Sequence, residues 1–332
     1  MVLYIVIMSM KSVLVEEIGL ISLSRGEVRE LEKVAKGFIA SLKAEGLKAF
    51  VGGSLAKGTL VRKDRQDVDV FVVFDYGEDV VRLEKVLKKV DLPGKLRKVH
   101  GSRDYFQIDS PLDSLWHRMG QGVLLEVIPV VKNSDPELAE NVTDVSLRHV
   151  KYVVGAIKKD PKLADEIKLA KAFCYANRVY GAESYVKGFS GYALEILVIH
   201  FGSFLKFLKK MQAGSGQQAA GDRKIVVDPL KYFRGEREVL SEINASKLGG
   251  PVVLVDPTFK YRNVTAGLGD ESFERFLKVS KEFIGRPSLD YFEMKDIDVK
   301  ALRALAGSGQ RAAGSIFRRG RRGCLMKFLG RL

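Results

Sequence analysis

The sequence predicts an α+β fold, in which an α/β head with a mixed sheet is followed by a helical neck and a small α/β body. Three observations predict this order. Two apolar runs, at residues 68–74 and 123–131, are typical of strands buried on both faces. From about residue 144 to 210, apolar residues recur at helical spacing instead. Two short strand-like runs, IVVDP at 225–229 and VVLVDP at 252–257, then precede an amphipathic helix.

The elements of the head follow one another from residue 24. Ser24 and Glu27 form the sequence signature of a capping box that opens a helix through about Ala44. A strand at 49–51 comes next, then the first apolar strand, and residues 80–90 have the periodicity of a helix. The polar stretch 94–122 is predicted to form a long hairpin or an insertion before the second apolar strand.

The neck and the body continue with predicted helices at 164–175, 191–209 and 272–283 and a flexible loop at 213–221. Between Lys300 and Leu332 there are nine basic residues and no acid. We divide the chain into an N-terminal extension and lead-in (1–22), a head (23–142), a helical neck (143–240), a body (241–293) and a basic tail (294–332).

Composition narrows the class of protein. With 46% hydrophobic residues among 332, the chain can build two or three packed units. Its net charge of +14 favours a polyanionic partner, nucleic acid before membrane. Cys174 and Cys324 indicate neither a disulfide framework nor a zinc site, so we expect a reducing cytoplasm. The apolar opening MVLYIVIMSM is shorter than the roughly 20 residues that span a bilayer, and we interpret it as an extension.

Three carboxylates interrupt the two apolar strands. Asp67 and Asp69 are two residues apart, so their side chains leave the same face of the sheet, and Glu126 stands alone in the second strand. An isolated Asp-x-Asp is usually a solvated strand edge, but the apolar run after it indicates burial, where unpaired like charges are unfavourable. Three carboxylates that converge from two strands make an oxygen-rich site for Mg²⁺.

A glycine-rich turn precedes the aspartates. The stretch GGSLAKGT at 52–59 lacks the spacing of a P-loop, because its lysine stands one place too early. Glycines nevertheless let backbone N–H groups approach phosphate oxygens, and the Ser54 hydroxyl adds a donor. A triphosphate on this turn, with two Mg²⁺ ions on the carboxylates, suits in-line attack of a hydroxyl on a nucleoside triphosphate with pyrophosphate leaving.

These motifs resemble the DNA polymerase β-like nucleotidyltransferase superfamily, whose signature is Gly-Ser, then Asp-x-Asp, then a third acid. Further stretches resemble the archaeal (class I) CCA-adding tRNA nucleotidyltransferases over roughly residues 10–293. They are TDVSLRHVKYV (143–153), LAKAFCYANRVYGAESYVKGFSGYALEILVIHFGSF (169–204), VDPTFKYRNVTAGL (255–268) and PSLDYF (287–292). The resemblance implies a cytoplasmic, Mg²⁺-dependent enzyme that adds C, C and A to tRNA 3′ ends from CTP and ATP without a template.

The resemblance also implies roles for single residues. Asp67 and Asp69 would bind the metal ions, and Glu126 would be the third carboxylate, acting on the RNA hydroxyl. The residues implied to bind the nucleotide are Gly53, Ser54, Lys57, Ser146, His149, Lys171, Tyr180 and Arg262, the last of these in the base pocket. Taken singly, several of these side chains also suit ordinary helix or core positions; their occurrence together with the metal motif favours nucleotide binding.

Three departures from the family pattern leave alternatives open. The third acid is Glu126 where the family has Asp, and its extra methylene moves the carboxylate by about 1.5 Å. Residues 100–122 enlarge a short family segment, which leaves the choice of nucleotide open and gives no role to His100 or Arg103. The chain also ends without the family's tail domain, which fits a compact enzyme, a split protein whose tail domain is a second polypeptide, or a frameshifted gene.

The basic tail suits non-specific binding of RNA phosphates, through Arg318, Arg319, Arg321 and Arg322. The expected partners are tRNA or a tRNA-like RNA, nucleoside triphosphates, and either a second copy of the chain or a separate tail-domain subunit; no membrane is expected. Two alternatives remain. One is a nucleotidyltransferase with another acceptor, such as an oligoadenylate synthetase or a modifier of a different RNA or of a protein. The other is a non-catalytic RNA-binding subunit of a split enzyme.

Overall fold

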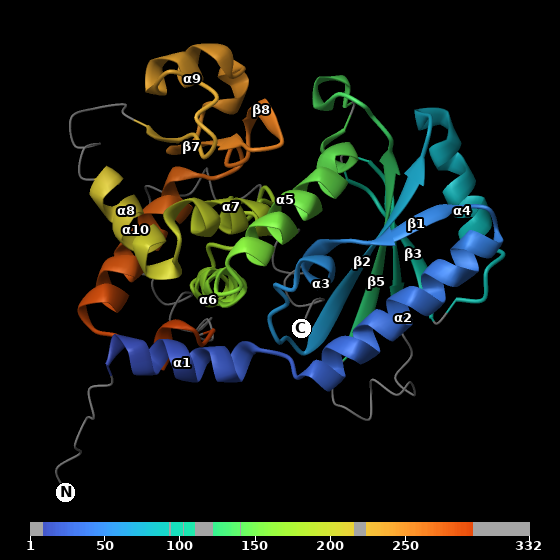
Figure 1. Ribbon diagram of the computed structural model, residues 1–332, viewed down its shortest axis with the longest axis horizontal. Coiled ribbons are helices and arrows are strands. Elements are labelled where there is room, and N and C mark those ends of the chain that lie inside the picture. The colour runs from blue at the N-terminus through green and yellow to red at the C-terminus, as the bar shows by residue number, and fades with distance from the viewer. Residues whose placement is uncertain are drawn as a thin grey trace, which may run out of the picture.

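The computed structural model describes residues 9–92, 94–101, 103–109, 122–139, 141–215 and 224–294, which form a sheet-containing part and a mainly helical part (Figure 1). Four predictions lie wholly or partly outside these residues. They concern the start of the apolar opening, most of the stretch 100–122, most of the loop at 213–221, and the basic tail with Arg318, Arg319, Arg321 and Arg322.

A mixed five-stranded sheet forms the head, with its strands in the order β1-β2-β5-β4-β3. They are Lys48–Val51 (β1), Arg65–Phe74 (β2), Lys95–Val99 (β3), Tyr105–Asp109 (β4) and Gly122–Val131 (β5). β2 and β5 are parallel neighbours in the middle of the sheet, whereas β1 joins β2, and β4 joins β5, in antiparallel fashion. The structure confirms the two predicted apolar strands, and it shows that the polar stretch begins with the hairpin of β3 and β4.

Two helices, α2 (Arg25–Ala44) and α4 (Val81–Leu87), bury their apolar sides against one face of this sheet. The predicted capping box is present at the start of α2, where the Ser24 N–H donates to a Glu27 carboxylate oxygen at 2.6 Å and the Ser24 hydroxyl accepts from the Glu27 N–H. Val68 and Val70 of β2 belong to this core. Because side chains alternate along a strand, the residues between and beside them leave the opposite face.

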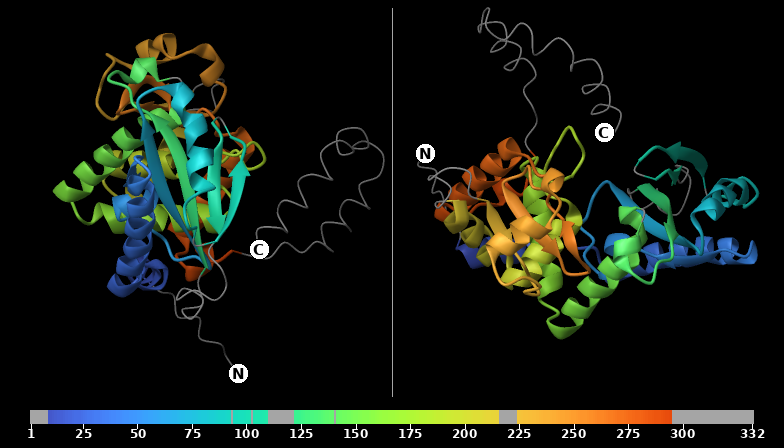
Figure 2. Two further views of the ribbon diagram at one scale, coloured as in Figure 1. Left: turned by 90° about the vertical axis from the view of Figure 1, so that its right-hand side faces the viewer. Right: turned by 90° about the horizontal axis from the view of Figure 1, so that it is seen from above.

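The helical part contains α1, α5, α6, α7, α8 and α10, which span Met10–Ile21, Ser146–Lys159, Leu163–Ala176, Gly191–Phe201, Phe204–Ser215 and Asp270–Gly285. α5 runs between the head and the other helices (Figures 1 and 2) and contacts α3 (Gly53–Lys57) of the head as well as α6 and α7. α1, whose residues the sequence groups with the N-terminal lead-in, places Val13 in the same core as α6 and α7.

The prediction of one continuous helix at 191–209 is wrong. The chain forms α7 and α8 with a bend of 93° between them, at Gly202, whose φ of +81° suits glycine. Apolar periodicity continues through the bend because both helices bury residues in one core, so the pattern alone does not reveal it. Within the described residues, no single helix is long and apolar enough to cross a membrane; α7 and α8 reach that length and composition only as a bent pair.

A small three-stranded sheet, in the order β6-β7-β8, follows at residues 225–263 together with α9 (Glu236–Glu242). Its strands are Ile225–Val227 (β6), Val252–Asp256 (β7) and Phe259–Asn263 (β8), which confirms the two predicted strands in this region. β7 is buried on both sides: Val252 and Leu254 join the core of the helical part, whereas Val253 and Val255 join a smaller core with α9. The predicted boundary at residue 240 stays a prediction.

Candidate active site

Carboxylates from the two central strands lie side by side on the sheet face that α2 and α4 do not cover. The register places Asp69 of β2 opposite Glu126 of β5, and Asp67 lies two residues before Asp69 on the same face. Gln107 of β4 continues this row and donates from Nε2 to Glu126 Oε1 at 2.6 Å. Glu126 is the one acid of β5, as the sequence predicts, and an amide from the neighbouring strand partners it.

The carboxylates of Asp67, Asp69 and Glu126, here called the carboxylate row, repel one another. The pKa of the Asp69 carboxyl is raised to about 7, because burial and the charges of Glu126 and Asp67 outweigh the opposing ammonium groups of Lys57 and Lys63. A divalent cation would offset this repulsion, and carboxylate oxygens are the ligands that Mg²⁺ prefers. The donor chemistry thus fits Mg²⁺, although among the described residues no three acidic, His or Cys side chains are already arranged as a complete metal site.

The glycine-rich turn is fitted to the carboxylate row. It leads into α3 (Gly53–Lys57), and the Gly52 N–H donates to the Asp69 carbonyl oxygen at 2.8 Å. Gly53 has a φ of +53°, and a Cβ on it would lie 1.6 Å from Asp69 Oδ2. A Cβ on Gly52 would meet the ring of Phe71 at 2.5 Å. Only glycine therefore lets the turn approach the strand so closely, which leaves Ser54 beside the aspartates.

Two buried lysines meet at one carboxylate behind this turn. Lys57 Nζ lies 2.7 Å from Glu195 Oε2, and Lys171 Nζ lies 2.8 Å from Glu195 Oε1. Lys171 also donates to the hydroxyls of Ser54, at 3.1 Å, and Thr59, at 2.9 Å. Burial lowers the pKa of Lys171 while the Glu195 carboxylate opposes the change. The two lysines predicted to bind a triphosphate are therefore held together beside Ser54 by a residue that the sequence did not single out.

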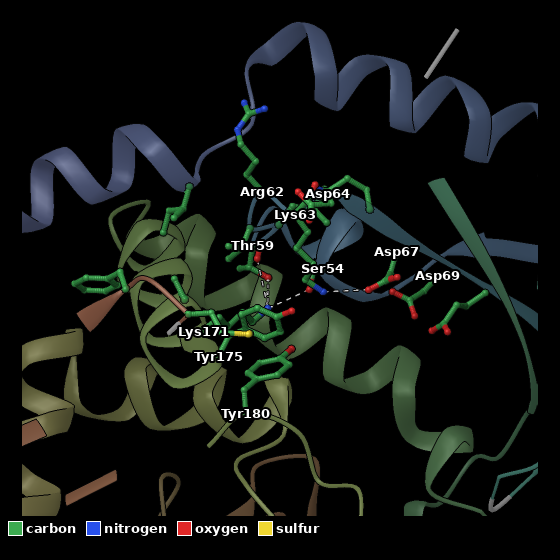
Figure 3. Close-up of a pocket in the computed structure, with 18 residues that line it drawn as sticks. Ser54, Thr59, Arg62, Lys63, Asp64, Asp67, Asp69, Lys171, Tyr175 and Tyr180 are labelled. Atoms are coloured by element: carbon green, nitrogen blue, oxygen red, sulfur yellow. Dashed lines mark hydrogen bonds and ion pairs between the residues drawn. The ribbon is translucent and has the colours of Figure 1, made fainter. Parts of the chain in front are cut away.

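A cavity of about 450 Å³ joins several of the predicted site residues. Figure 3 shows Asp67 and Asp69 on one side of it and Lys171 and Tyr180 on another, with Ser54 between them. The size lies in the range typical of pockets that hold small ligands. The predicted residues that line this cavity are Ser54, Asp67, Asp69, Glu126, Lys171 and Tyr180; Gly53, Lys57, Ser146, His149 and Arg262 are not among its lining residues.

Two of the remaining predicted residues meet in a second cluster. Asp256, at the end of β7, accepts from Arg262 Nη1 at 2.7 Å and from the Tyr192 hydroxyl at 3.0 Å, and its Oδ2 lies 3.2 Å from His149 Nε2. Burial would raise the pKa of Asp256, but His149 and Arg262 outweigh it and hold this pKa well below its usual range. Ser146 begins α5, one helical turn before His149. The cluster fixes the arginine and the imidazole relative to each other.

The two clusters are linked by an aromatic ring. Tyr192 stacks on His149 with ring centroids 3.8 Å apart, and Lys57 Nζ lies 5.5 Å from the centroid of the same ring. Arg103, to which the sequence gave no role, forms an ion pair with Asp144. The structure therefore joins five of the predicted residues directly or through one side chain: Ser54 with Lys171 by a hydrogen bond, Lys57 with Lys171 through Glu195, and His149 with Arg262.

Sequence reasoning missed Glu195 and Asp256, although each left a signal. Glu195 is the lone acid in the apolar helical run YALEILVI, and Asp256 ends the apolar strand VVLVD. A lone acid in a buried element has to find a partner, because an unpaired buried charge is costly. The partners stand elsewhere in the chain, so the sequence could flag these residues but not pair them.

Sequence comparison places this site among known proteins. Residues 165–293 match the family model described as tRNA nucleotidyltransferase, second domain. The chain is 34% identical to the CCA-adding enzyme of Nanoarchaeum equitans over 253 residues, which are 75% of this chain and 58% of that enzyme. It is 29% identical to the CCA-adding enzyme of Archaeoglobus fulgidus over 301 residues, which are 90% of this chain and 62% of that enzyme. The chain thus spans a little over half the length of the curated relatives it matches.

Solved structures support the fold. A cytoplasmic RNA terminal U-transferase matches with a TM-score of 0.63 at 12% identity, over 87% of this chain and 99% of that one. The poly(U) polymerase Cid1 matches with a TM-score of 0.64 at 13% identity, over 87% of this chain and 100% of that one. The chain therefore shares the fold of these two proteins. On the sequence matches, the chain is similar to archaeal CCA-adding enzymes over most of its own length.

Proposed function

We propose that this protein is a template-independent RNA 3′-terminal nucleotidyltransferase that adds C, C and A to tRNA from CTP and ATP. The observation that carries the proposal is the carboxylate row of Asp69 and Glu126 beside a glycine turn, with a buried lysine on the far side of the same cavity. The names of three sequence relatives, each a CCA-adding enzyme, support the acceptor and the bases.

The reaction forms a bond between the RNA 3′ oxygen and the α-phosphorus and breaks the bond from the α-phosphorus to the β-phosphate oxygen. Pyrophosphate leaves, and the hydroxyl proton passes to solvent. Asp67 and Asp69 would hold two Mg²⁺ ions, with Glu126 as the third carboxylate. Bound there, Mg²⁺ lowers the pKa of the attacking hydroxyl and neutralises charge on the leaving pyrophosphate. A solved structure of Cid1 carries MgATP, which supports this choice of ion.

The chain's own residues would orient the triphosphate. The Gly53 and Ser54 backbone approaches the phosphate oxygens, as in other glycine turns. Lys57 and Lys171 bring positive charge to the same end, and the Tyr180 hydroxyl faces the cavity as a neutral donor, because burial raises its pKa to about 12. These residues fix the α-phosphorus against the carboxylate row, so that attack and departure lie in line.

The second cluster would read the base. Arg262 carries several donors in a fixed plane, and Asp256 and His149 hold that plane in place. Ser146 would add a hydroxyl at the start of α5. The positive net charge of the chain favours the RNA backbone, and another Cid1 structure holds the dinucleotide product ApU, which fits an RNA end in this fold. Cys174, free and buried, agrees with the cytoplasmic location that we propose.

Nucleotide incorporation tests the proposal. The protein is incubated with Mg²⁺ and tRNA transcripts that end before CCA, after C or after CC, and each of the four labelled triphosphates is supplied singly. We expect C on the first two substrates and A only on the third. A minihelix of the acceptor stem, run in parallel, shows whether the part of the tRNA beyond that stem is needed.

Other outcomes would point elsewhere. Addition of a single base, including U, whatever the 3′ end would replace CCA addition by tailing of RNA ends. Modification of a different acceptor, with no addition to tRNA, would favour the alternative of a nucleotidyltransferase with another acceptor. RNA binding without incorporation of any nucleotide would favour the non-catalytic subunit.

A further inference from the structure

A buried carboxylate outside the carboxylate row, that of Glu195, contacts both lysines of the proposed triphosphate site. Glu195 is 1% exposed, and the side chains of Lys57 and Lys171 are 10% and 6% exposed. Each ammonium lies within 2.8 Å of a different oxygen of the carboxylate. The three charges are almost completely shielded from solvent, so the carboxylate stabilises both ammonium groups and they stabilise it. Removal of one leaves a buried charge uncompensated.

The contacts of Glu195 join elements that the chain places far apart. Lys57 comes from α3 in the head, Lys171 from α6, and Glu195 from α7. The Thr59 hydroxyl donates to Glu195 Oε1 at 3.2 Å and accepts from Lys171, and Lys171 reaches on to Ser54. These hydrogen bonds hold the side chains in place without a ligand, and they hold the Lys171 ammonium group beside Ser54 of the glycine turn.

We propose that Glu195 is a positioning residue for the triphosphate: it supplies the counter-charge for Lys57 and Lys171 and holds both ammonium groups beside the Ser54 turn. The inference rests on the proposed function, since it takes these lysines as phosphate ligands. With one carboxylate between two ammonium groups, the cluster keeps a positive charge that a triphosphate can use.

Charge at Lys171 is the property that distinguishes this role from mere packing. Burial raises the pKa of Glu195, but Lys171 and Lys57 outweigh it and hold this pKa at about 2, so Glu195 is ionised at every practical pH. Lys171 also faces the ammonium groups of Lys57 and Lys63, which lower its pKa, and Tyr180 stays neutral beside it. The carboxylates of Asp67 and Asp69 lie across the same cavity.

The substitution Glu195→Gln keeps the size of the side chain and removes its charge. The pKa of Lys171 then falls further, because burial and two neighbouring cations act on it without opposition from Glu195. We expect affinity for ATP and for inorganic tripolyphosphate, measured by calorimetry in Mg²⁺-free buffer from pH 6 to 9, to stay within about threefold of the original protein at pH 6. Above the lowered pKa the affinity should fall about tenfold per pH unit, while the original protein keeps its affinity to a higher pH.

A matched control comes from α6. Glu166 accepts from the Phe204 N–H at 2.7 Å and thus holds the start of α8, so Glu166→Gln removes a structural carboxylate away from the lysines. The affinity of Glu166→Gln for ATP and tripolyphosphate should change with pH in the same way as that of the original protein. A parallel profile in Glu195→Gln as well, whether lowered at every pH or unchanged, would overturn the inference. The KM for ATP in incorporation should show the same pH shift as the binding constant.

Two further measurements keep the test decisive. If circular dichroism shows that Glu195→Gln does not fold, the double change Lys57→Met with Glu195→Gln retains the net charge of the cluster and should shift the pH profile in the same direction, by less because Lys57 no longer lowers the pKa of Lys171. Failure of the proposed function is recognised separately, in the original protein. Binding of ATP without incorporation into any RNA would remove the proposed function and leave the pH test valid, whereas no binding of ATP or tripolyphosphate would end both.

Discussion

The closest approach in the site, between Gly53 and Asp69, yields a prediction with a built-in control. Gly53→Ala would place a Cβ 1.6 Å from Asp69 Oδ2 and 2.4 Å from its Cγ. Ordinary contact needs about 3.5 Å, so the carboxylate or the turn must retreat by roughly 2 Å. A catalytic group misplaced by about 1 Å can lower the rate about a hundredfold. We therefore expect kcat for nucleotide incorporation to fall at least about a hundredfold.

Gly58→Ala is the control for backbone strain. Gly58 closes the same short helix with a φ of +70°, and a Cβ on it would meet nothing within 4 Å. Alanine in the left-handed region costs about 1–2 kcal/mol at either position, so both variants should melt at lower temperature, and Gly53→Ala by at least as much as Gly58→Ala. Only Gly53→Ala should lose activity. Steady-state incorporation and thermal melting measure the two effects, and more than a tenth of the original kcat in Gly53→Ala would refute the role given to this contact.

Three more predictions follow. Asp67→Asn or Asp69→Asn should lower nucleotide incorporation by about a thousandfold or more, because the lost charge is needed to bind Mg²⁺. RNA binding in a filter assay should stay within about twofold of the original protein. Retained activity in either variant would contradict the two-metal assignment. Burial, helped by Glu293, raises the pKa of Glu17 from 4.5 to about 7. The folded chain therefore holds the Glu17 proton more tightly than the unfolded chain does. The protonated side chain stabilises the fold by up to about 3 kcal/mol below pH 4.5, and this stability is lost as the pH rises through 7. Glu17→Gln should remove this dependence in chemical denaturation, whereas Glu16→Gln, an exposed neighbour on α1, should keep it; identical pH profiles for both variants would argue against a buried Glu17. Alanine at all four arginines of the tail should weaken RNA binding chiefly at low salt and reduce the slope of log affinity against log salt by up to about 3; an unchanged salt series would remove the tail from RNA binding. The four are Arg318, Arg319, Arg321 and Arg322.

Local patterns were enough to predict α2, β1, β2, α4 and β5 of the head. The capping box at Ser24 and the two apolar strands depend on residues within a few positions of one another, so the sequence contains the whole signal. The same holds for Asp67 and Asp69, whose common face follows from the alternation of a single strand. Gly202 shows the limit of this reasoning, because a helical period continues across a bend when both halves bury the same side.

The sequence by itself determined which residues carry charge at the site and where they stand: the acid pair on β2, the glycine turn before it with Lys57, and Lys171 on a predicted helix. Only the tertiary structure decided their partners. Glu195 lies 138 positions from Lys57, and the partner of His149 lies 107 positions away, so these contacts depend on how separate elements pack. A charged residue in a buried element indicates that a partner is required, because an unpaired buried charge is costly. Which residue becomes the partner depends on the packing of distant elements, and a local sequence pattern does not contain that information.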